Sequence, residues 1–269
     1  MGMMERFVES AEARVEARKA EVPMTELEGR IELAGDGQRP FKEALTRPGI
    51  SVIAEFKRRS PSAGDIRPDA SVAEVALVYE QAGAAAMSVL TDEDFCGGSL
   101  ADLREARACS DLPILEKDFV VDRYQLYEAK ANGADAVLLI VAALDRDTLA
   151  ALHAEARSID LDCLVEVHDE RELEIALTVD ADVLGINNRN LDDLSVSVET
   201  TLELITEVPA GMTVVSESGI SERDTVVELD RVGVDAVLVG EALMSGSEPG
   251  STFADLFPDE EGTSEHKLP

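Results

Sequence analysis

Aromatic residues, cysteine and histidine are scarce in this chain of 269 residues. It has no tryptophan, three tyrosines and seven phenylalanines, so its hydrophobic core must be mainly aliphatic. The three cysteines, Cys96, Cys109 and Cys163, form no Cys-x-x-Cys pair, and together with three histidines they offer no metal-ligand cluster. We therefore expect buried free thiols, no bound metal and no cofactor.

Long apolar runs are lacking as well. The first 20 residues are charged and amphipathic and have no apolar segment of the kind found in signal peptides. No run approaches the roughly 20 apolar residues that a membrane span needs. We expect a soluble, cytoplasmic protein that does not associate with membranes.

Basic residues are few. The chain has 56 acidic and 24 basic residues, a net charge of −32, and only six lysines. A surface of this sign repels the phosphate backbone, which argues against nucleic acid as a partner. Because salt screens the repulsion between carboxylates, the composition also favours a salt-adapted protein over an ordinary acidic one.

Short apolar runs alternate with helical patterns through the middle of the chain. The predicted strands are Ser51–Phe56, Ala85–Leu90, Pro113–Leu115, Ala136–Val141, Cys163–Val167, Val183–Ile186, Thr213–Ser216 and Ala236–Val239. Amphipathic helices are predicted over Ser71–Gln81, Ser99–Ala108, Arg123–Ala131, Arg146–Ser158 and Glu170–Leu177. Strict alternation implies parallel strands, and eight such units favour an α/β fold of the closed (β/α)8 TIM-barrel type over an open doubly wound sheet.

A weak repeat supports closure of the barrel. Gly83, Gly133 and Gly233 each end a predicted helix just before a strand, at a spacing of about 50 residues, and Asp180-Ala181-Asp182 is a degenerate copy.

Two segments lie outside the eight units, which span residues 51–245. We expect residues 1–50 to form a helical extension that caps a barrel end, with at least one helix, over about Met4–Val22. Residues 246–269 are predicted to be a mostly disordered acidic tail, with Phe253 and Phe257 as anchors for its first part.

Charged residues stand at the carboxyl ends of all four odd-numbered strands. Glu55 and Lys57 lie two residues apart, on one side of the first strand. Lys117, Glu166 and Glu217 lie at or just beyond the carboxyl ends of the third, fifth and seventh predicted strands. Catalytic groups of such barrels lie on this face, and burial can move acids and bases toward neutral pKa values, which suits proton transfer.

Small-residue turns follow the last two strands. Ser218-Gly219 and Gly240-Glu241 each lead into a helix, and their backbone N–H groups are suited to wrapping a phosphate. Loops at these two positions commonly hold phosphate in (β/α)8 barrels. Ser60, after the first strand, is placed to close over the same group.

These segments together resemble the indole-3-glycerol-phosphate synthase family. The matching stretches, in order, are Arg47–Gly49, Ile53–Ser62, Ser88–Asp92, Phe95–Ser99, Leu115–Phe119, Leu164–His168, Gly185–Leu191, Ser216–Ile220 and Val239–Met244. The resemblance implies an enzyme of tryptophan biosynthesis. Its substrate would be 1-(2-carboxyphenylamino)-1-deoxyribulose 5-phosphate, and its products indole-3-glycerol phosphate, carbon dioxide and water. The acidic composition suggests a haloarchaeal member.

The resemblance also implies catalytic roles. Lys117 would protonate the keto oxygen, while Lys57 would neutralise the substrate carboxylate and donate a proton to the departing hydroxyl. The division of labour between the two lysines stays open. Glu166 would be the general base, or the acid of dehydration. Glu55 would hold and tune the lysines.

Binding roles follow in the same way. Asn187 and Glu217 would contact the sugar hydroxyls and also stabilise charge, which places both among the catalytic residues. The further binding residues are Ser60, Ser218, Gly219, Gly240 and Glu241 for the phosphate, Phe95, Phe119 and Leu138 for the anthranilate ring, and Arg189. We expect a small molecule as the partner and a monomer, with a weak homo-oligomer or contact with another pathway enzyme as the alternative.

One residue departs from the expected pattern, and other functions stay open. Glu116 replaces the basic or apolar residue expected before Lys117, and it should point toward the helices because neighbouring strand residues face opposite ways. The rival functions are a phosphoribosylanthranilate isomerase, a class I aldolase with Lys117 as Schiff-base nucleophile, and a non-catalytic binding barrel.

Overall fold

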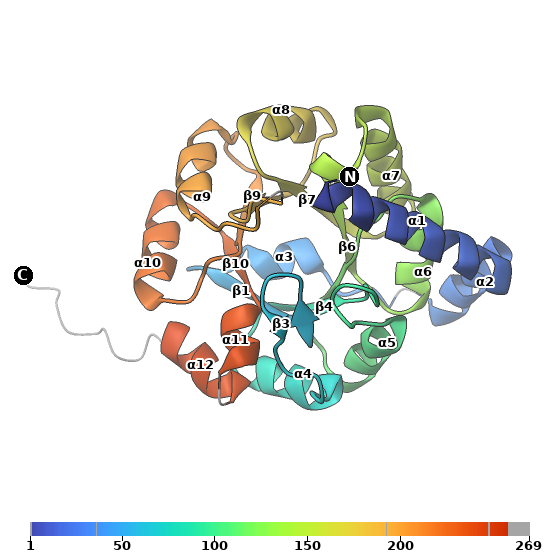
Figure 1. Ribbon diagram of the computed structural model, residues 1–269, viewed down its shortest axis with the longest axis horizontal. Coiled ribbons are helices and arrows are strands. Elements are labelled where there is room, and N and C mark those ends of the chain that lie inside the picture. The colour runs from blue at the N-terminus through green and yellow to red at the C-terminus, as the bar shows by residue number, and fades with distance from the viewer. Residues whose placement is uncertain (1, 36, 192, 247, 258–269) are drawn as a thin grey trace, which may run out of the picture.

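Eight parallel strands close into a barrel in the computed structural model, which describes residues 2–35, 37–191, 193–246 and 248–257. The strands are β1 (Ser51–Phe56), β4 (Ala86–Leu90), β5 (Ile114–Lys117), β6 (Ala136–Ile140), β7 (Asp162–Val167), β8 (Val183–Asn187), β9 (Thr213–Glu217) and β10 (Ala236–Val239). They pair in sequence order, and β10 pairs with β1 (Figure 1). The predicted TIM barrel is confirmed, and the open sheet is wrong.

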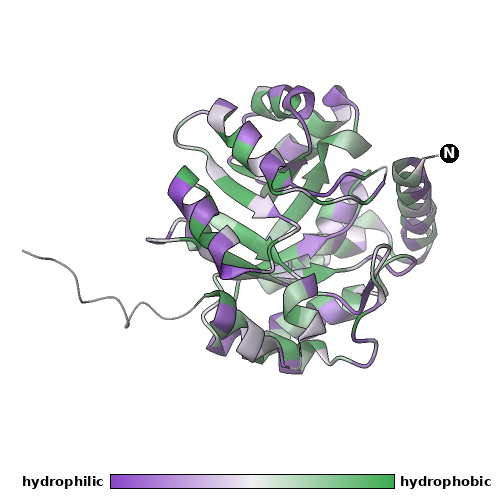
Figure 2. Cartoon of the chain, turned by 60° about the vertical axis from the view of Figure 1, so that its left-hand side comes forward, coloured by the Kyte–Doolittle hydropathy of each residue, from purple (hydrophilic) through white to green (hydrophobic). Residues whose placement is uncertain are grey.

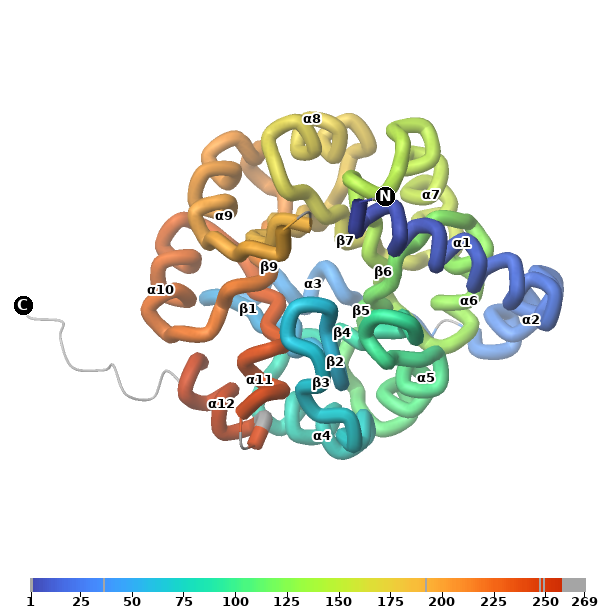
Figure 3. Tube along the Cα trace, viewed as in Figure 1, coloured from blue at the N-terminus to red at the C-terminus, as the bar shows by residue number. Residues whose placement is uncertain are grey.

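Helices surround the ring of strands (Figure 3). They are α4 (Val72–Gln81), α5 (Leu100–Cys109), α6 (Arg123–Ala131), α7 (Arg146–Ser158), α8 (Glu170–Thr178), α9 (Glu199–Leu204), α10 (Arg223–Val232) and α11 (Glu241–Ser245), with 3-10 turns η1 (Val141–Ala143) and η2 (Ile205–Glu207). Several begin where a side chain accepts a hydrogen bond from a first-turn backbone N–H, as Ser99, Asp145 and Asp169 do.

Apolar side chains form two layers, one between strands and helices and one inside the barrel. Figure 2 shows hydrophobic strands inside helices that carry much of the hydrophilic surface. The inner layer, which includes Ile53, Leu115 and Leu164, ends at α3 (Phe41–Leu45), whose Phe41 is fully buried. The helix therefore plugs the amino-terminal end of the barrel.

The glycine repeat ends helices as its spacing predicted. Gly83, Gly133 and Gly233 have φ angles of 89°, 96° and 94°, which an L side chain rarely adopts. Asp180, in the degenerate copy, has a φ of 56°. In the second copy Asp135 is fully buried, and its carboxylate accepts a hydrogen bond from the backbone N–H at the start of β5.

Both ends of the described chain are helical. The first 50 residues form α1 (Met3–Glu21), α2 (Met24–Ala34) and α3. Helix α1 crosses the viewer's side of the barrel in Figure 1, while α3 lies behind it. Residues 249–256 form α12 (Pro249–Leu256), in which Phe253, one of the two predicted anchors, and Leu256 bury their side chains in the outer layer. Residues 258–269 of the predicted tail lie outside the described residues.

No helix within the described ranges has both the length and the apolar character needed to cross a membrane.

Candidate active site

A cavity of about 530 Å³ opens at the carboxyl ends of the barrel strands. Its lining includes fourteen of the fifteen predicted site residues, which are Glu55, Lys57, Ser60, Phe95, Lys117, Phe119, Leu138, Glu166, Asn187, Arg189, Ser218, Gly219, Gly240 and Glu241. The fifteenth, Glu217, is fully buried behind this lining and contacts Lys117. The structure thus brings together residues that are up to 186 positions apart, from 55 to 241.

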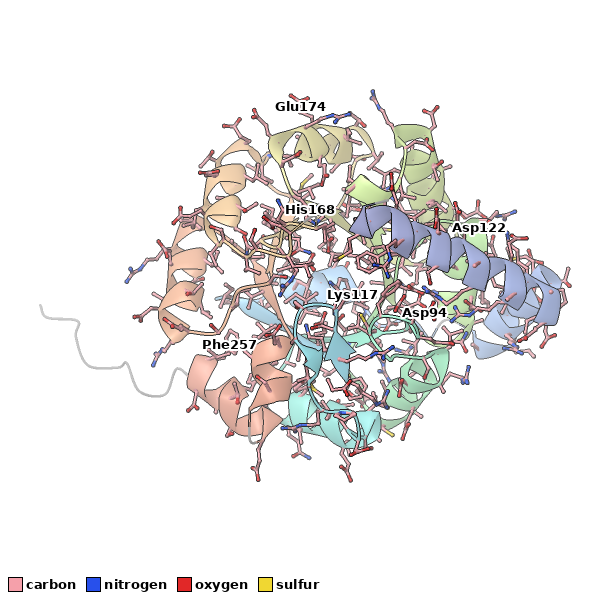
Figure 4. All side chains as sticks on the ribbon, in the orientation of Figure 1. Asp94, Lys117, Asp122, His168, Glu174 and Phe257 are labelled. Atoms are coloured by element: carbon pink, nitrogen blue, oxygen red, sulfur yellow. The ribbon has the colours of Figure 1, made fainter. Side chains whose placement is uncertain are left out.

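The ammonium group of Lys117 lies among three carboxylates, and Figure 4 shows this lysine near the middle of the barrel. Its Nζ is 3.3 Å from Oε2 of Glu217 and 3.8 Å from Oε2 of both Glu55 and Glu166. The three glutamates are at most 4% exposed. A lysine so placed has one charged neighbour on each of three other strands, which fixes its position in the pocket.

Lys57 shares Glu55 with Lys117. Its Nζ lies 2.7 Å from Oε1 of Glu55, so one carboxylate holds both lysines. Backbone glycines make room for the acids. A Cβ atom at Gly240 would lie 2.1 Å from Oε1 of Glu55, and one at Gly185 would lie 2.3 Å from Oε1 of Glu217. Only glycine fits at either position without moving a carboxylate.

The charges around Lys117 keep it protonated. Burial favours the neutral amine, but the charges of Glu217, Glu166 and Glu55 raise the pKa of Lys117 well above its ordinary value. Burial, which the sequence suggested could move this pKa toward neutral, is therefore outweighed by the three carboxylates within 4 Å of the Lys117 Nζ. Burial raises the pKa of Glu217 in spite of the attraction of Lys117.

The carboxylate of Glu166 is kept ionised instead. Burial alone would raise the pKa of Glu166, but His168, Lys117 and a hydrogen bond from Asn187 lower it. The backbone N–H of Arg189 donates to Oδ1 of Asn187 at 3.0 Å, which leaves the Asn187 amide to face Glu166.

Small-residue turns from three loops border the same cavity. Ser218 and Gly219 have φ angles of 65° and 80°, and Gly219 packs against Val196, a residue of the loop after β8. The guanidinium of Arg189 lies 3.8 Å from the carboxylate of Glu241. Ser60 lies on the hairpin of β2 (Arg59–Ser60) and β3 (Gly64–Asp65), on the viewer's side of Figure 1.

One aromatic residue of the cavity was missed by the sequence analysis. Phe7, on α1, packs edge-on against Phe95 with ring centroids 4.6 Å apart, and it stacks on Phe119 at 4.7 Å. With Leu138 these rings form an apolar wall in a chain that has only seven phenylalanines. Because phenylalanine is scarce, Phe7 could have been singled out from the sequence. No local motif, however, links residue 7 to residues 95 and 119.

Helix α1 is held over the site by ion pairs. Arg14 binds Asp92 at 2.9 Å and Asp118 at 2.7 Å, and both aspartates are nearly fully buried. Asp118 directly follows Lys117, so α1 is tied to the strand end that carries this lysine. Glu116 points away from the cavity, as predicted, and accepts a hydrogen bond from Thr91.

The described part of the chain contains no cluster of three His, Cys, Asp or Glu side chains suited to a metal ion. The polar side chains of the cavity are instead acids paired with lysines, and its glycine turns present backbone N–H groups suited to an anion.

A closed (β/α)8 barrel with acids and lysines at the carboxyl ends of its strands defines a barrel enzyme. Residues 4–256 match the family model of indole-3-glycerol phosphate synthase. The chain belongs to this family, whose members are carboxy-lyases of tryptophan biosynthesis.

Individual relatives agree with the family match. The chain is 47% identical to indole-3-glycerol phosphate synthase 2 of Streptomyces coelicolor over 258 residues, which are 95% of this chain and 98% of that protein. It is 45% identical to indole-3-glycerol phosphate synthase of a Parafrankia species, over 95% of each chain.

Solved structures show the same fold. A chain of the tryptophan synthase α2β2 complex from Pyrococcus furiosus is similar with a TM-score of 0.59 and 18% identity, over 77% of this chain and 97% of that chain. At this identity the likeness concerns the fold alone. The haloarchaeal origin and salt preference stay predictions.

Proposed function

We propose that this protein closes the indole ring, converting 1-(2-carboxyphenylamino)-1-deoxyribulose 5-phosphate into indole-3-glycerol phosphate, carbon dioxide and water. The observation that carries the proposal is the position of Lys117 among Glu55, Glu166 and Glu217, in a cavity that also contains three aromatic rings and two glycine turns. Membership of the family supports the same reaction.

Ring closure needs an acid at the keto oxygen. The aryl carbon that bears the carboxylate bonds to the keto carbon, and the carbonyl oxygen takes a proton from Lys117 to become a hydroxyl. The raised pKa of Lys117 ensures that this proton is present at neutral pH. The same pKa argues against the aldolase alternative, since a Schiff base forms from the neutral amine.

The remaining steps release carbon dioxide and water. Loss of the carboxylate as carbon dioxide restores the aromatic ring, and Lys57 stays beside this group until it leaves. Lys57 then gives a proton to the departing hydroxyl, and Glu166 accepts the carbon-bound proton whose loss completes the indole. Glu166 suits this step because its lowered pKa leaves it ionised, and therefore able to accept a proton.

Binding groups hold the two ends of the substrate. The turns at Ser218-Gly219 and Gly240-Glu241, together with Ser60, surround the phosphate. The guanidinium of Arg189 exchanges its ion pair with Glu241 for one with an anionic group of the substrate. The anthranilate ring packs against Phe95, Phe119 and Leu138. Asn187 contacts a sugar hydroxyl, whereas Glu217 first fixes the ammonium of Lys117, its direct neighbour.

The test follows indole fluorescence in concentrated potassium chloride with wild type, Lys117→Ala and Lys42→Ala. We expect turnover in the wild type and in Lys42→Ala, whose ammonium binds Asp182 outside the cavity. Lys117→Ala should lose turnover while substrate binding stays largely intact. Absence of wild-type turnover at every salt concentration would refute the function. A borohydride-stable adduct at Lys117 would instead support the aldolase.

A further inference from the structure

A chain of charged contacts leads from Glu166 away from the cavity, and the mechanism above leaves it unused. Oε1 of Glu166 lies 3.3 Å from Nε2 of His168, just beyond the end of β7. Nδ1 of the same ring lies 2.9 Å from Oε2 of Glu172, on the first turn of α8. This oxygen also accepts the backbone N–H of His168 at 2.8 Å. Figure 4 shows His168 between the barrel centre and α8.

The geometry calls for a charged imidazole. Each ring nitrogen of His168 lies within 3.3 Å of a carboxylate oxygen, through a hydrogen bond at Nδ1 and an ion-pair contact at Nε2, and a neutral ring has only one N–H. In the neutral form one nitrogen lone pair would face a carboxylate at close range. Burial favours the neutral ring, but Glu166 and Glu172 raise the pKa of His168 to about 10. The ring is 13% exposed, so solvent screens these contacts little.

Glu166 therefore has a cation facing each of its oxygens. Lys117 lies 3.8 Å from Oε2, and His168 lies 3.3 Å from Oε1. The other groups that influence Glu166 are the amide of Asn187, which favours the ionised form, and the carboxylate of Glu217, to which it is electrostatically coupled. In the proposed ring closure Lys117 gives up its proton and its charge. From that point His168 is the cation that still faces Glu166, and it opposes protonation of this carboxylate together with the amide of Asn187.

We propose that His168, held by Glu172, is a positioning residue that keeps Glu166 ionised and oriented as the base while Lys117 is neutral. The inference rests on the proposed function for the identity of the step that Glu166 serves. The imidazolium itself does not touch the substrate, because it lies behind Glu166 and does not line the cavity. It acts by fixing the charge and the direction of the carboxylate.

The first experiment measures kcat and kcat/KM against pH for wild type, His168→Gln, Glu172→Gln and the matched control His153→Gln. His153 is also buried but lies on α7, away from the cavity. Without the imidazolium the pKa of Glu166 rises, and activity that needs ionised Glu166 is then lost at a higher pH as the solution is acidified. We expect the acidic limb to move up by about 1 pH unit in His168→Gln.

The variants should form a graded series. Glu172→Gln should shift the limb in the same direction by less, because the ring stays but binds its proton less tightly. His153→Gln should match the wild type, and KM should change little in every variant. An acidic limb that stays in place in folded His168→Gln would overturn the proposal, as would an equal shift in His153→Gln.

A second experiment needs no turnover. Nitrogen-15 NMR of the imidazole rings resolves three histidines in this chain, and His168→Gln assigns one of them. We expect His168 to stay protonated at pH 8 in the wild type and to titrate lower in Glu166→Gln. A neutral His168 ring at pH 8 would overturn the proposal whatever the activity. Wild-type turnover separately tests the proposed function, so a failure of the His168 proposal can be distinguished from a failure of the proposed function.

Discussion

Replacing Glu116 by glutamine should stabilise this protein above neutral pH. Glu116 is 3% exposed, and its Oε1 accepts a hydrogen bond from Thr91 at 2.9 Å. Its Oε2 has no hydrogen-bond partner among the described residues. Burial, together with the charge of Asp118, raises the pKa of Glu116 from 4.5 to about 8. The native state therefore holds a carboxyl group that resists ionisation.

The sign and size of the effect follow from linkage. Between pH 4.5 and about 8 the folded protein binds a proton at Glu116 that the unfolded chain has released, so stability falls as the pH rises through this window. At about 1.4 kcal/mol per pH unit the cost reaches roughly 3 kcal/mol at pH 7 and levels off near 5 kcal/mol above pH 8. Glutamine has the shape of the protonated acid and cannot ionise. Allowing for local relaxation, we expect Glu116→Gln to gain about 2 kcal/mol at pH 8 and almost nothing at pH 5.

Urea unfolding at pH 5 and pH 8, at one fixed high salt concentration, measures the difference. Glu9→Gln is the matched control, because Glu9 lies on the exposed face of α1. The control should change stability equally little at both pH values. If Glu116→Gln gave the same change at pH 5 and pH 8, or lost stability at pH 8, Glu116 would not be the buried acid described above.

Two further changes test the site and the composition. Gly185→Ala would bring a Cβ atom to 2.3 Å from Oε1 of Glu217, so we expect kcat to fall about tenfold or more, while Gly29→Ala, where a Cβ meets nothing within 4 Å, should keep wild-type kinetics. Equal kcat values for the two variants would contradict the close approach. Potassium chloride should raise the melting temperature, because the net charge of −32 repels itself and the Debye length falls from about 10 Å at 0.1 M to about 3 Å at 1 M salt. An unchanged melting temperature over this range would refute the prediction of salt adaptation.

The barrel could be predicted because its signals are local. Each strand is a short apolar run, and three of the four helix–strand junctions of the repeat contain a glycine with positive φ, while Asp180 takes that place in the degenerate copy. Strand ends were predicted less well, and β5 continues through Glu116 and Lys117, where the sequence suggested an end at Leu115. These two residues pair with Val89 and Leu90 of β4, and polarity alone gives no sign of such backbone pairing.

Features that depend on distant contacts were not predictable in the same way. Helix α3 has only five residues, too few for a periodic pattern, yet Phe41 is fully buried beneath the barrel. Phe7 meets Phe95 and Phe119 only because α1 folds back across the strand ends. The predicted site residues came together for a simpler reason, since the carboxyl ends of all eight strands share one face.

The protonation states of the site depend on which charges become neighbours, and sequence order does not give this. Burial alone would lower the pKa of Lys117, but the fold surrounds its ammonium group with three carboxylates, and the pKa rises. Burial alone likewise predicts a protonated Glu166, but Lys117 and His168 face its two oxygens and the pKa falls. In both cases an opposite charge within 4 Å outweighs desolvation. An acid and a base can therefore coexist in one buried cluster, and the same neighbours that hold these groups in place also set which of them begins with the proton.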